Sequence, residues 1–145
     1  MTKKVDYIIR DFEEKDFTAL DILWQRTCIG GEERGDNLDI INNTFKKGGR
    51  LLIMEEKISG CLIGSSWITI DGRRSYLHHF GILPEYQKNG LGKELLKESL
   101  KIAKDIGLQI KLEVHKNNIA AIKLYEKYGF KYLGDYIVQI IRDIT

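Results

Sequence analysis

Residues 87–93, Gln-Lys-Asn-Gly-Leu-Gly-Lys, place two glycines and two lysines directly before a run of helix-forming residues. The first backbone N–H groups of a helix have no partner inside the helix, and the helix dipole favours negative charge at that end. Glycines at this point let an anion such as a phosphate approach the backbone closely. The stretch therefore predicts either an anion-binding loop or a plain turn, with Lys88 and Lys93 as anion contacts or as solvated surface side chains.

Two familiar phosphate-binding loops do not match this stretch. Glu94 follows Gly92-Lys93, at the position where the loop of P-loop nucleotide-binding proteins needs a serine or threonine. Leu95 stands where the dinucleotide-binding fingerprint has its third glycine. That fingerprint also belongs to a first βαβ unit, whereas this loop follows four expected strands.

The elements that must position the loop follow from the change of apolar period between strands and helices. Their expected order is β-α-α-β-β-β-α-β-α-β-β, an α/β or α+β domain with a mixed sheet. In chain order we expect a strand at residues 5–10, a helix at residues 17–24, a helix from a cap at Asp36 or Asn37 to Gly48-Gly49, strands at residues 50–56 and 57–70, a hairpin turn at Asp71-Gly72, a strand at residues 73–83, a helix at residues 91–106, a strand at residues 109–114, a helix from Asn118 to Gly129, and two short strands about Gly134-Asp135.

Composition narrows the class of protein. The chain has 145 residues, of which 43% are apolar and 30% charged, as in one ordinary globular domain covering residues 1–145. Its net charge of +2 is spread along the chain, which argues against a nucleic-acid binder. We expect no membrane span, signal peptide or metal site, and the isolated Cys28 and Cys61 indicate a cytoplasmic protein with reduced thiols.

Residues 87–92 match the pattern Gln/Arg-x-x-Gly-x-Gly/Ala, and in this the chain resembles the GNAT superfamily of acyl-CoA-dependent N-acyltransferases, where the pattern forms the pyrophosphate loop. Residues 118–130 are similar to the family's segment Asn-x-x-Ala-x-x-Leu-Tyr-x-x-x-Gly-Phe. The resemblance is specific over residues 76–133. Leu112-Glu113-Val114 adds a similarity to the bacterial ribosomal-protein alanine N-acetyltransferases within the superfamily.

The resemblance implies a mostly antiparallel sheet with splayed central strands, whose gap receives the pantetheine arm of acetyl-CoA. Gly81 lies within a strand pattern, where a glycine marks a bulge or a close backbone approach. Either it opens the strand to the arm or it merely relieves twist. The implied cofactor-binding residues are Phe80, Ile82, Leu83, Gln87, Lys88, Asn89, Gly90, Leu91, Gly92, Lys93, Asn118 and Tyr125.

Acetyl transfer to an amine needs an acid for the leaving thiolate and a base for the amine. Tyr125 matches the family's tyrosine and is the implied general acid, with a core aromatic as its alternative role. Glu113 corresponds to the carboxylate of the resembling subfamily, whereas His79 or His78 suits the base because histidine titrates near neutrality. An α-amine, with a pKa of about 8, also needs only a modest base or a water chain.

The sequence thus predicts an acetyl-CoA-dependent N-acetyltransferase that acts by direct attack in a ternary complex. Its acceptor would be a primary amine of a small molecule or of a peptide or protein N-terminus, and Glu32 and Glu33 would attract a cationic amine or face solvent. The alternatives are a non-catalytic acyl-CoA-binding sensor and a nucleotide-binding enzyme. The apolar C-terminal stretch could cover a partner surface, so the sequence predicts either a monomer or a homodimer.

Overall fold

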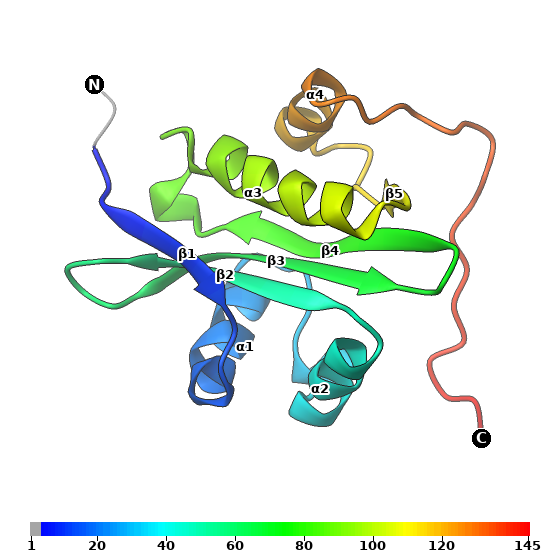
Figure 1. Cartoon of the computed structure of the whole chain (residues 1–145), viewed down its shortest axis with the longest axis horizontal. Helices are drawn as coiled ribbons and strands as arrows, with labels where there is room; N and C mark the ends of the chain where they lie inside the picture. Colours follow the sequence, from blue (N-terminus) through cyan, green and yellow to red (C-terminus); the bar gives the residue numbers. More distant parts are fainter. Residues whose placement is uncertain (1–3) are drawn as a thin grey trace. The chain divides into compact units, whose positions relative to one another are not determined.

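A five-stranded sheet organises the first part of the chain. Its strands lie in the order in which they occur: β1 (Tyr7–Asp11), β2 (Arg50–Glu56), β3 (Leu62–Ile70), β4 (Arg74–Ile82) and β5 (Gln109–Leu112). The pairs β1–β2, β2–β3 and β3–β4 are antiparallel, and only β4–β5 is parallel. The sheet is therefore mixed and mostly antiparallel, as expected (Figure 1).

This computed structural model describes residues 4–145, and the chain divides into two compact units, Met1–Glu113 and Val114–Thr145. The sheet and three α-helices belong to the first unit, and the fourth helix belongs to the second. Each unit is described by itself below. The expectation of one domain over residues 1–145 stays a prediction.

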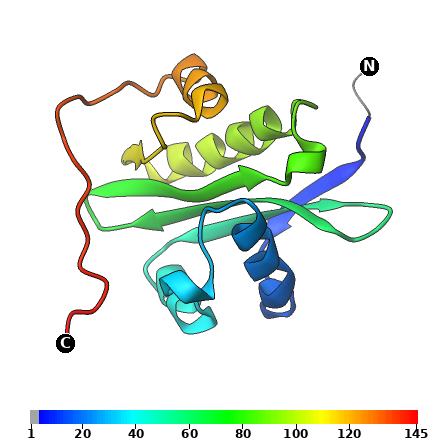
Figure 2. The same ribbon diagram turned by 180° about the vertical axis from the view of Figure 1, so that it is seen from behind.

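Helices cover both faces of the sheet. α1 (Phe17–Arg26) and α2 (Leu38–Lys46) lie on one face and α3 (Leu91–Ile106) on the other (Figures 1 and 2). The central strands are consequently buried on both sides, and Leu51–Met54 of β2 read as a continuous apolar run without alternation. Ser66 of β3 and Ser99 of α3 share a buried hydrogen bond of 2.6 Å, so Ser66 faces α3.

Local signals set the helix ends. Asn37 caps α2, because its side-chain oxygen accepts a hydrogen bond of 2.9 Å from the backbone N–H of Ile40. α3 ends at Gly107, whose φ of 78° is the left-handed conformation that favours glycine. Both ends were expected, except that Asp36, the alternative cap, has a different partner described below.

Two expected boundaries in the sheet are wrong. The turn between β3 and β4 has Gly72 and Arg73 at its centre instead of Asp71-Gly72, because the backbone N–H of Asp71 donates to the carbonyl of Arg74 at 3.1 Å. The Asp71 carboxylate accepts from the N–H groups of Arg73 and Arg74, which shifts the turn by one residue. β3 begins at Leu62 and not at residue 57.

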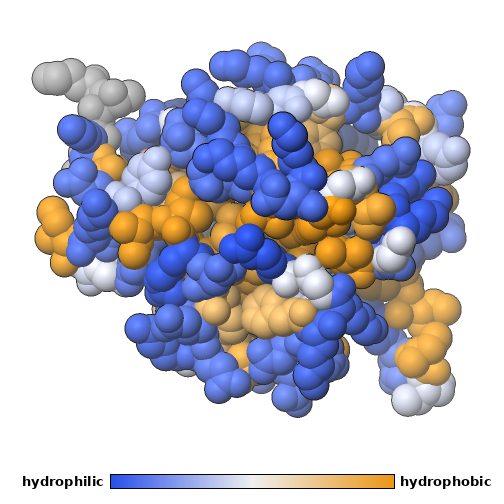
Figure 3. Space-filling view, viewed as in Figure 1, coloured by the Kyte–Doolittle hydropathy of each residue, from blue (hydrophilic) through white to orange (hydrophobic). Residues whose placement is uncertain are grey.

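The second unit contains α4 (Ile119–Lys127) and a C-terminal segment, residues 131–145, which has no strand. The two expected final strands are therefore wrong. Alternating apolar residues indicate which face of a strand would be buried, but they do not supply the neighbouring backbone that a strand requires. The large apolar side chains of this segment are exposed on the surface (Figure 3): Tyr132, Leu133, Tyr136, Ile137, Val138, Ile140, Ile141 and Ile144.

Across residues 4–145, the structure has no helix that is both long enough and apolar enough to cross a membrane. The same residues contain no group of three or more histidine, cysteine or acidic side chains arranged to hold a metal ion.

Candidate active site

β4 and β5 pair over only four residues. Their register begins at Arg74↔Gln109 and ends at Leu77↔Leu112, while β4 continues to Ile82. The last five residues of β4 therefore run beyond the end of β5. This unpaired end of β4 agrees with the split between central strands that the resemblance implies.

A bulge interrupts β4 where this split begins. Gly81 pairs with Ser65 and His78 with Trp67, so two residues of β4, His79 and Phe80, oppose the single residue Ser66 of β3. His79 has a φ of 45°, in the left-handed region that a bulge can impose on a non-glycine residue. The bulge lies just before Gly81, the residue that indicated it.

Gly81 has a packing role of its own. A Cβ atom built on Gly81 would lie 3.0 Å from Cδ1 of Ile29, in the segment that follows α1. A side chain at this point would therefore require the end of the Ile29 side chain to shift, because the segment after α1 approaches β4 closely.

Beyond the bulge, the backbone N–H and carbonyl groups of β4 point alternately toward β3 and away from it. The N–H of Leu83 donates to the carbonyl of Ile63 at 2.8 Å, on the β3 side. The carbonyl of Ile82 points to the other side, since Nε2 of Gln87 donates to it at 2.9 Å. Gln87, expected to bind the cofactor, is thus tied to the strand that would receive it. Phe80 is half-buried, and Ile82 and Leu83 are buried.

The glycine loop leads from β4 into α3. Gly90 occupies the position before the helix with a φ of 77°, and it has no side chain to cap the first turn. The other side-chain amide of the loop, that of Asn89, donates to the carbonyls of Tyr86 and Gln87 at 3.2 and 3.3 Å and so holds the loop closed. α3 therefore begins without a side-chain cap, unlike α2.

A cavity of about 480 Å³ adjoins this loop. It is lined by the loop, the first turn of α3 and the chain leading into β1: Lys4, Val5, Tyr7, Asn89, Gly90, Leu91, Lys93 and Glu94. Two lysine side chains and the uncapped end of α3 therefore border the same cavity. Lys88, with a φ of 64°, is exposed and does not line it.

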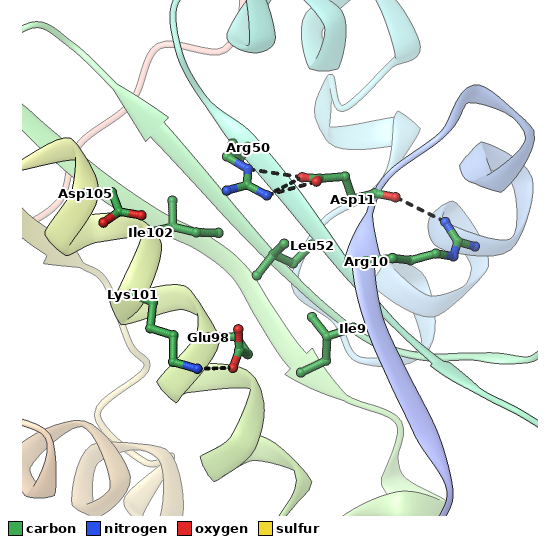
Figure 4. Close-up of a pocket in the computed structure, with 9 residues that line it drawn as sticks. All are labelled: Ile9, Arg10, Asp11, Arg50, Leu52, Glu98, Lys101, Ile102 and Asp105. Atoms are coloured by element: carbon green, nitrogen blue, oxygen red, sulfur yellow. Dashed lines mark hydrogen bonds and ion pairs between the residues drawn. The ribbon is translucent and has the colours of Figure 1, made fainter.

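A second cavity, of about 260 Å³, lies between β1, β2 and the C-terminal half of α3 (Figure 4). Its cations are paired with carboxylates: Arg10 with Asp16 and Glu55, Arg50 with Asp11, and Lys101 with Glu98. The residues that line the cavity carry three positive and three negative charges, the latter on Asp11, Glu98 and Asp105, so the lining has no net charge to attract an ion.

The remaining expected site residues have distinct settings. Glu113 is exposed and follows β5, which ends at Leu112, so strand alternation does not fix its direction. In the second unit Asn118 caps α4 by accepting a hydrogen bond of 3.3 Å from the N–H of Ala121. Tyr125 is 7% exposed, and its ring lies 5.6 Å from that of Phe130. Burial raises the pKa of Tyr125 to about 12, so its phenol is protonated at neutral pH.

Both histidines of β4 face α1 and α2, because the bulge cancels the alternation between neighbours. The His78 ring lies 6.3 Å from Trp67, and the His79 ring lies 4.6 Å from Trp24 and 5.2 Å from Trp67. Nε2 of His78 is 2.7 Å from the hydroxyl of Thr69. Burial, and to a smaller extent His79, lowers the pKa of His78 to about 4, which makes it a weak base.

We expect His78→Gln to make the fold less sensitive to acid. The folded pKa of about 4 lies below the unfolded value of about 6.5, so the unfolded chain binds more protons between these values. The stability that depends on neutral His78 is fully present above pH 6.5 and is lost as the pH falls through 4. At pH 4 this loss is about 3 kcal/mol. Glutamine does not titrate, and its side-chain amide is expected to keep a hydrogen bond to Thr69. Urea unfolding at pH 7 and pH 4 measures the difference, with His115→Gln on the exposed surface as control; equal acid losses in wild type and His78→Gln would contradict it.

The environment of His79 does not follow from the residues near it in the sequence. Asp36, considered only as a helix cap, lies with its Oδ2 atom 2.7 Å from Nε2 of His79. Trp24 lies in the helix expected at residues 17–24, and Ser65 lies in the strand expected at residues 57–70. No local pattern joins these residues, because they are distant in the sequence and meet only once α1 packs on β3.

A mixed sheet whose strand β4 runs beyond β5 and leads through a glycine loop into a helix is the arrangement that the resemblance implies for acyl-CoA-dependent transferases. Residues 10–130 match the family described as "Acetyltransferase (GNAT) family". Because this match covers most of the chain, the chain belongs to the GNAT family of acetyltransferases.

Two relatives and one solved structure illustrate the similarity. N-alpha-acetyltransferase RimI of Mycobacterium tuberculosis is 38% identical over 79 residues, covering 52% of this chain and 49% of the relative. The spermine/spermidine N(1)-acetyltransferase of Bacillus subtilis is 38% identical over 64 residues, covering 43% and 42%. This chain thus matches somewhat less than half the length of each relative.

The solved structure is a predicted acetyltransferase from Clostridium acetobutylicum, determined with acetyl-CoA. It superimposes with a TM-score of 0.71 at 22% identity, covering 92% of this chain and 96% of that one. The GNAT-like fold predicted from the sequence is thereby confirmed, apart from the last two strands.

Proposed function

We propose that this protein transfers the acetyl group of acetyl-CoA to a primary amine, by direct attack in a ternary complex and without a metal. The observation that carries the proposal is the split between β4 and β5 that continues into the glycine loop at the uncapped start of α3. A strand edge suits the amides of a pantetheine arm, and a helix N-terminus suits a pyrophosphate. Family membership supports the same cofactor.

In this proposal the cofactor lies along β4 and the loop. The backbone at Phe80, Ile82 and Leu83 would bind the arm and polarise the thioester carbonyl, since donors placed where charge develops contribute roughly 3 kcal/mol. The other residues proposed to contact the cofactor are Gln87, Lys88, Asn89, Gly90, Leu91, Gly92, Lys93, Asn118 and Tyr125. Lys93 is supported by its place beside the uncapped helix end.

The chemical step needs one acid and one base. Tyr125 would donate to the departing thiolate, a role supported by its protonated state. Glu113, His79, His78 or a water remains the proposed base, although its low pKa makes His78 a weak one. Neutral amine attacks the carbonyl carbon, the C–S bond breaks, and the amine's surplus proton passes to the base.

The acceptor is proposed as a small-molecule amine or a peptide N-terminus. Relatives named for an α-amine and for polyamines support both kinds. The exposed Glu32 and Glu33, in the segment between α1 and α2, would attract a cationic acceptor. Two exposed, unbridged thiols, Cys28 and Cys61, support a reducing compartment such as the cytoplasm. The proposal includes no nucleic-acid or membrane partner, and a monomer or a homodimer is compatible with it.

Acceptor screening tests the proposal directly. Purified protein with acetyl-CoA and a panel of N-terminal peptides, polyamines, aminoglycosides and amino acids is expected to release free CoA thiol with at least one class. Mass spectrometry of the acceptor should show one added acetyl group. Thermal stabilisation by acetyl-CoA without transfer to any amine would instead favour the non-catalytic sensor, which family membership does not favour. Stabilisation by ATP or NAD but not by CoA would favour a nucleotide-binding enzyme.

A further inference from the structure

His79 is held at three points by residues that are far apart in the sequence. Its Nε2 atom lies 2.7 Å from Oδ2 of Asp36, and the two side chains are 18% and 15% exposed. Its backbone carbonyl accepts a hydrogen bond of 2.7 Å from the Ser65 hydroxyl, which in turn accepts one of 2.9 Å from Trp24 Nε1. Trp24 and Trp67 both meet its ring edge to face. The imidazole is therefore fixed in position but remains accessible.

The pairing with Asp36 also sets which nitrogen carries hydrogen. Burial alone would raise the pKa of Asp36, but hydrogen bonds from His79 and from the backbone N–H of Gly31 outweigh it and lower the pKa. Asp36 is thus an ionised carboxylate, which only accepts hydrogen bonds. Nε2 of His79 must be the donor, so in the neutral ring Nδ1 carries the free lone pair.

The neighbouring chain leaves room for this pair only because residue 30 is glycine. A Cβ atom at Gly30 would overlap the His79 ring and would lie 2.6 Å from Oδ2 of Asp36. Gly30 does not need its φ for this role, since it is not among the residues with positive φ. Its lack of a side chain is explained by the contact alone.

We propose, on the basis of the function proposed above, that Asp36 is a positioning residue that orients His79 as the base of the transfer. Nδ1 of His79 takes the surplus proton of the acceptor nitrogen as the neutral amine attacks, and Nε2–H keeps its hydrogen bond to Asp36. The neutral amine attacks the thioester carbon, the C–S bond breaks, and the thiolate receives the phenolic proton of Tyr125. Asp36 stabilises the imidazolium that forms and does not itself take up the proton.

The groups that pack around His79 come from the segment before α2, from β4, from α1 and from β3. Asp36, in the segment before α2, is the carboxylate that contacts His79. The positive charge of Arg34, in the same segment, helps to lower the pKa of Asp36. On β4, His78 is the titratable neighbour. α1 and β3 contribute the indoles of Trp24 and Trp67 and the hydroxyl of Ser65, which do not titrate in the working range. Asp36 is therefore the carboxylate that contacts the His79 ring.

Asp36→Asn tests the pair, because asparagine keeps the shape and an accepting oxygen but removes the charge. We expect kcat to fall roughly 10- to 100-fold, with an unchanged KM for acetyl-CoA. The acid limb of the pH profile of kcat/KM should move to lower pH, since the imidazolium loses its counter-ion. Asp39→Asn, an exposed carboxylate on α2, is the matched control and should do neither.

Two further variants keep the test decisive. Gly30→Ala separates the pair without removing either group, and it should lower kcat as Asp36→Asn does. In a His79→Gln background, Asp36→Asn should have no further effect on kcat. An active wild type with an unmoved acid limb in Asp36→Asn, or full activity in His79→Gln, overturns the inference and leaves the proposed function standing. NMR of the His79 ring gives a readout that does not depend on activity. If Asp36→Asn shifts the His79 titration but the wild type acetylates no amine, the pair is structural and the proposed function fails.

Discussion

Tyr125→Phe is expected to lower kcat roughly 100-fold, within the usual range for loss of a general acid, while the KM for acetyl-CoA changes little. The variant retains the ring that packs on Phe130 and removes only the hydroxyl. Because burial raises the pKa of Tyr125 to about 12, the phenol donates to the leaving thiolate at any physiological pH. Loss of activity through its ionisation should begin only as the pH approaches that value.

Steady-state kinetics with the best acceptor from the screen measure this effect. Tyr128→Phe is the matched control, since Tyr128 is a half-buried tyrosine just past the end of the same helix. It should retain nearly full turnover. Unchanged turnover in Tyr125→Phe would remove this residue from the mechanism, and equal losses in the two variants would point to packing.

Gly92→Leu is expected to weaken acetyl-CoA binding roughly 100-fold without destabilising the fold. Gly92 is the second residue of α3, where glycine is less favourable than leucine or alanine by up to about 1 kcal/mol. Unlike Gly90, it has no left-handed φ that would require glycine. Its presence is therefore better explained by the approach of a pyrophosphate than by helix geometry.

Isothermal titration with acetyl-CoA and a thermal melt together check this prediction. Gly92→Ala is the control, because the family pattern allows alanine at this position. It should raise the melting temperature by a few degrees, in line with a gain of about 1 kcal/mol, and leave the affinity close to that of the wild type. Wild-type affinity in Gly92→Leu would mean that the loop is a turn and not a phosphate site.

Local patterns were enough to predict most of the fold. The amphipathic period of residues 91–106, ended by Gly107, coincides with α3, and the loop before it was identified by residue types alone. Asn118 is the predicted helix cap. These features depend on neighbours within a few residues, so the sequence contains them directly.

The features that were missed depend on contacts between distant segments. Whether residues 131–145 form strands depends on a backbone partner that their own alternation does not specify. The pairing of Asp36 with His79 joins residues separated by 43 positions, and it requires α1 and α2 to lie on one face of the sheet. Gly81 indicated a bulge, but only the register with β3 shows that the additional residue falls at His79 and Phe80.

The bulge in β4 makes the length of this strand as important as its composition. Ser66, the residue opposite the bulge, faces α3 through its bond to Ser99. Deletion of Phe80 alone would pair His79 with Ser66 and restore regular alternation. The imidazole would then stand on the α3 side, separated by the sheet from Asp36. A one-residue gap, which hardly alters a sequence comparison, would thus move the histidine from one layer of the protein to the other.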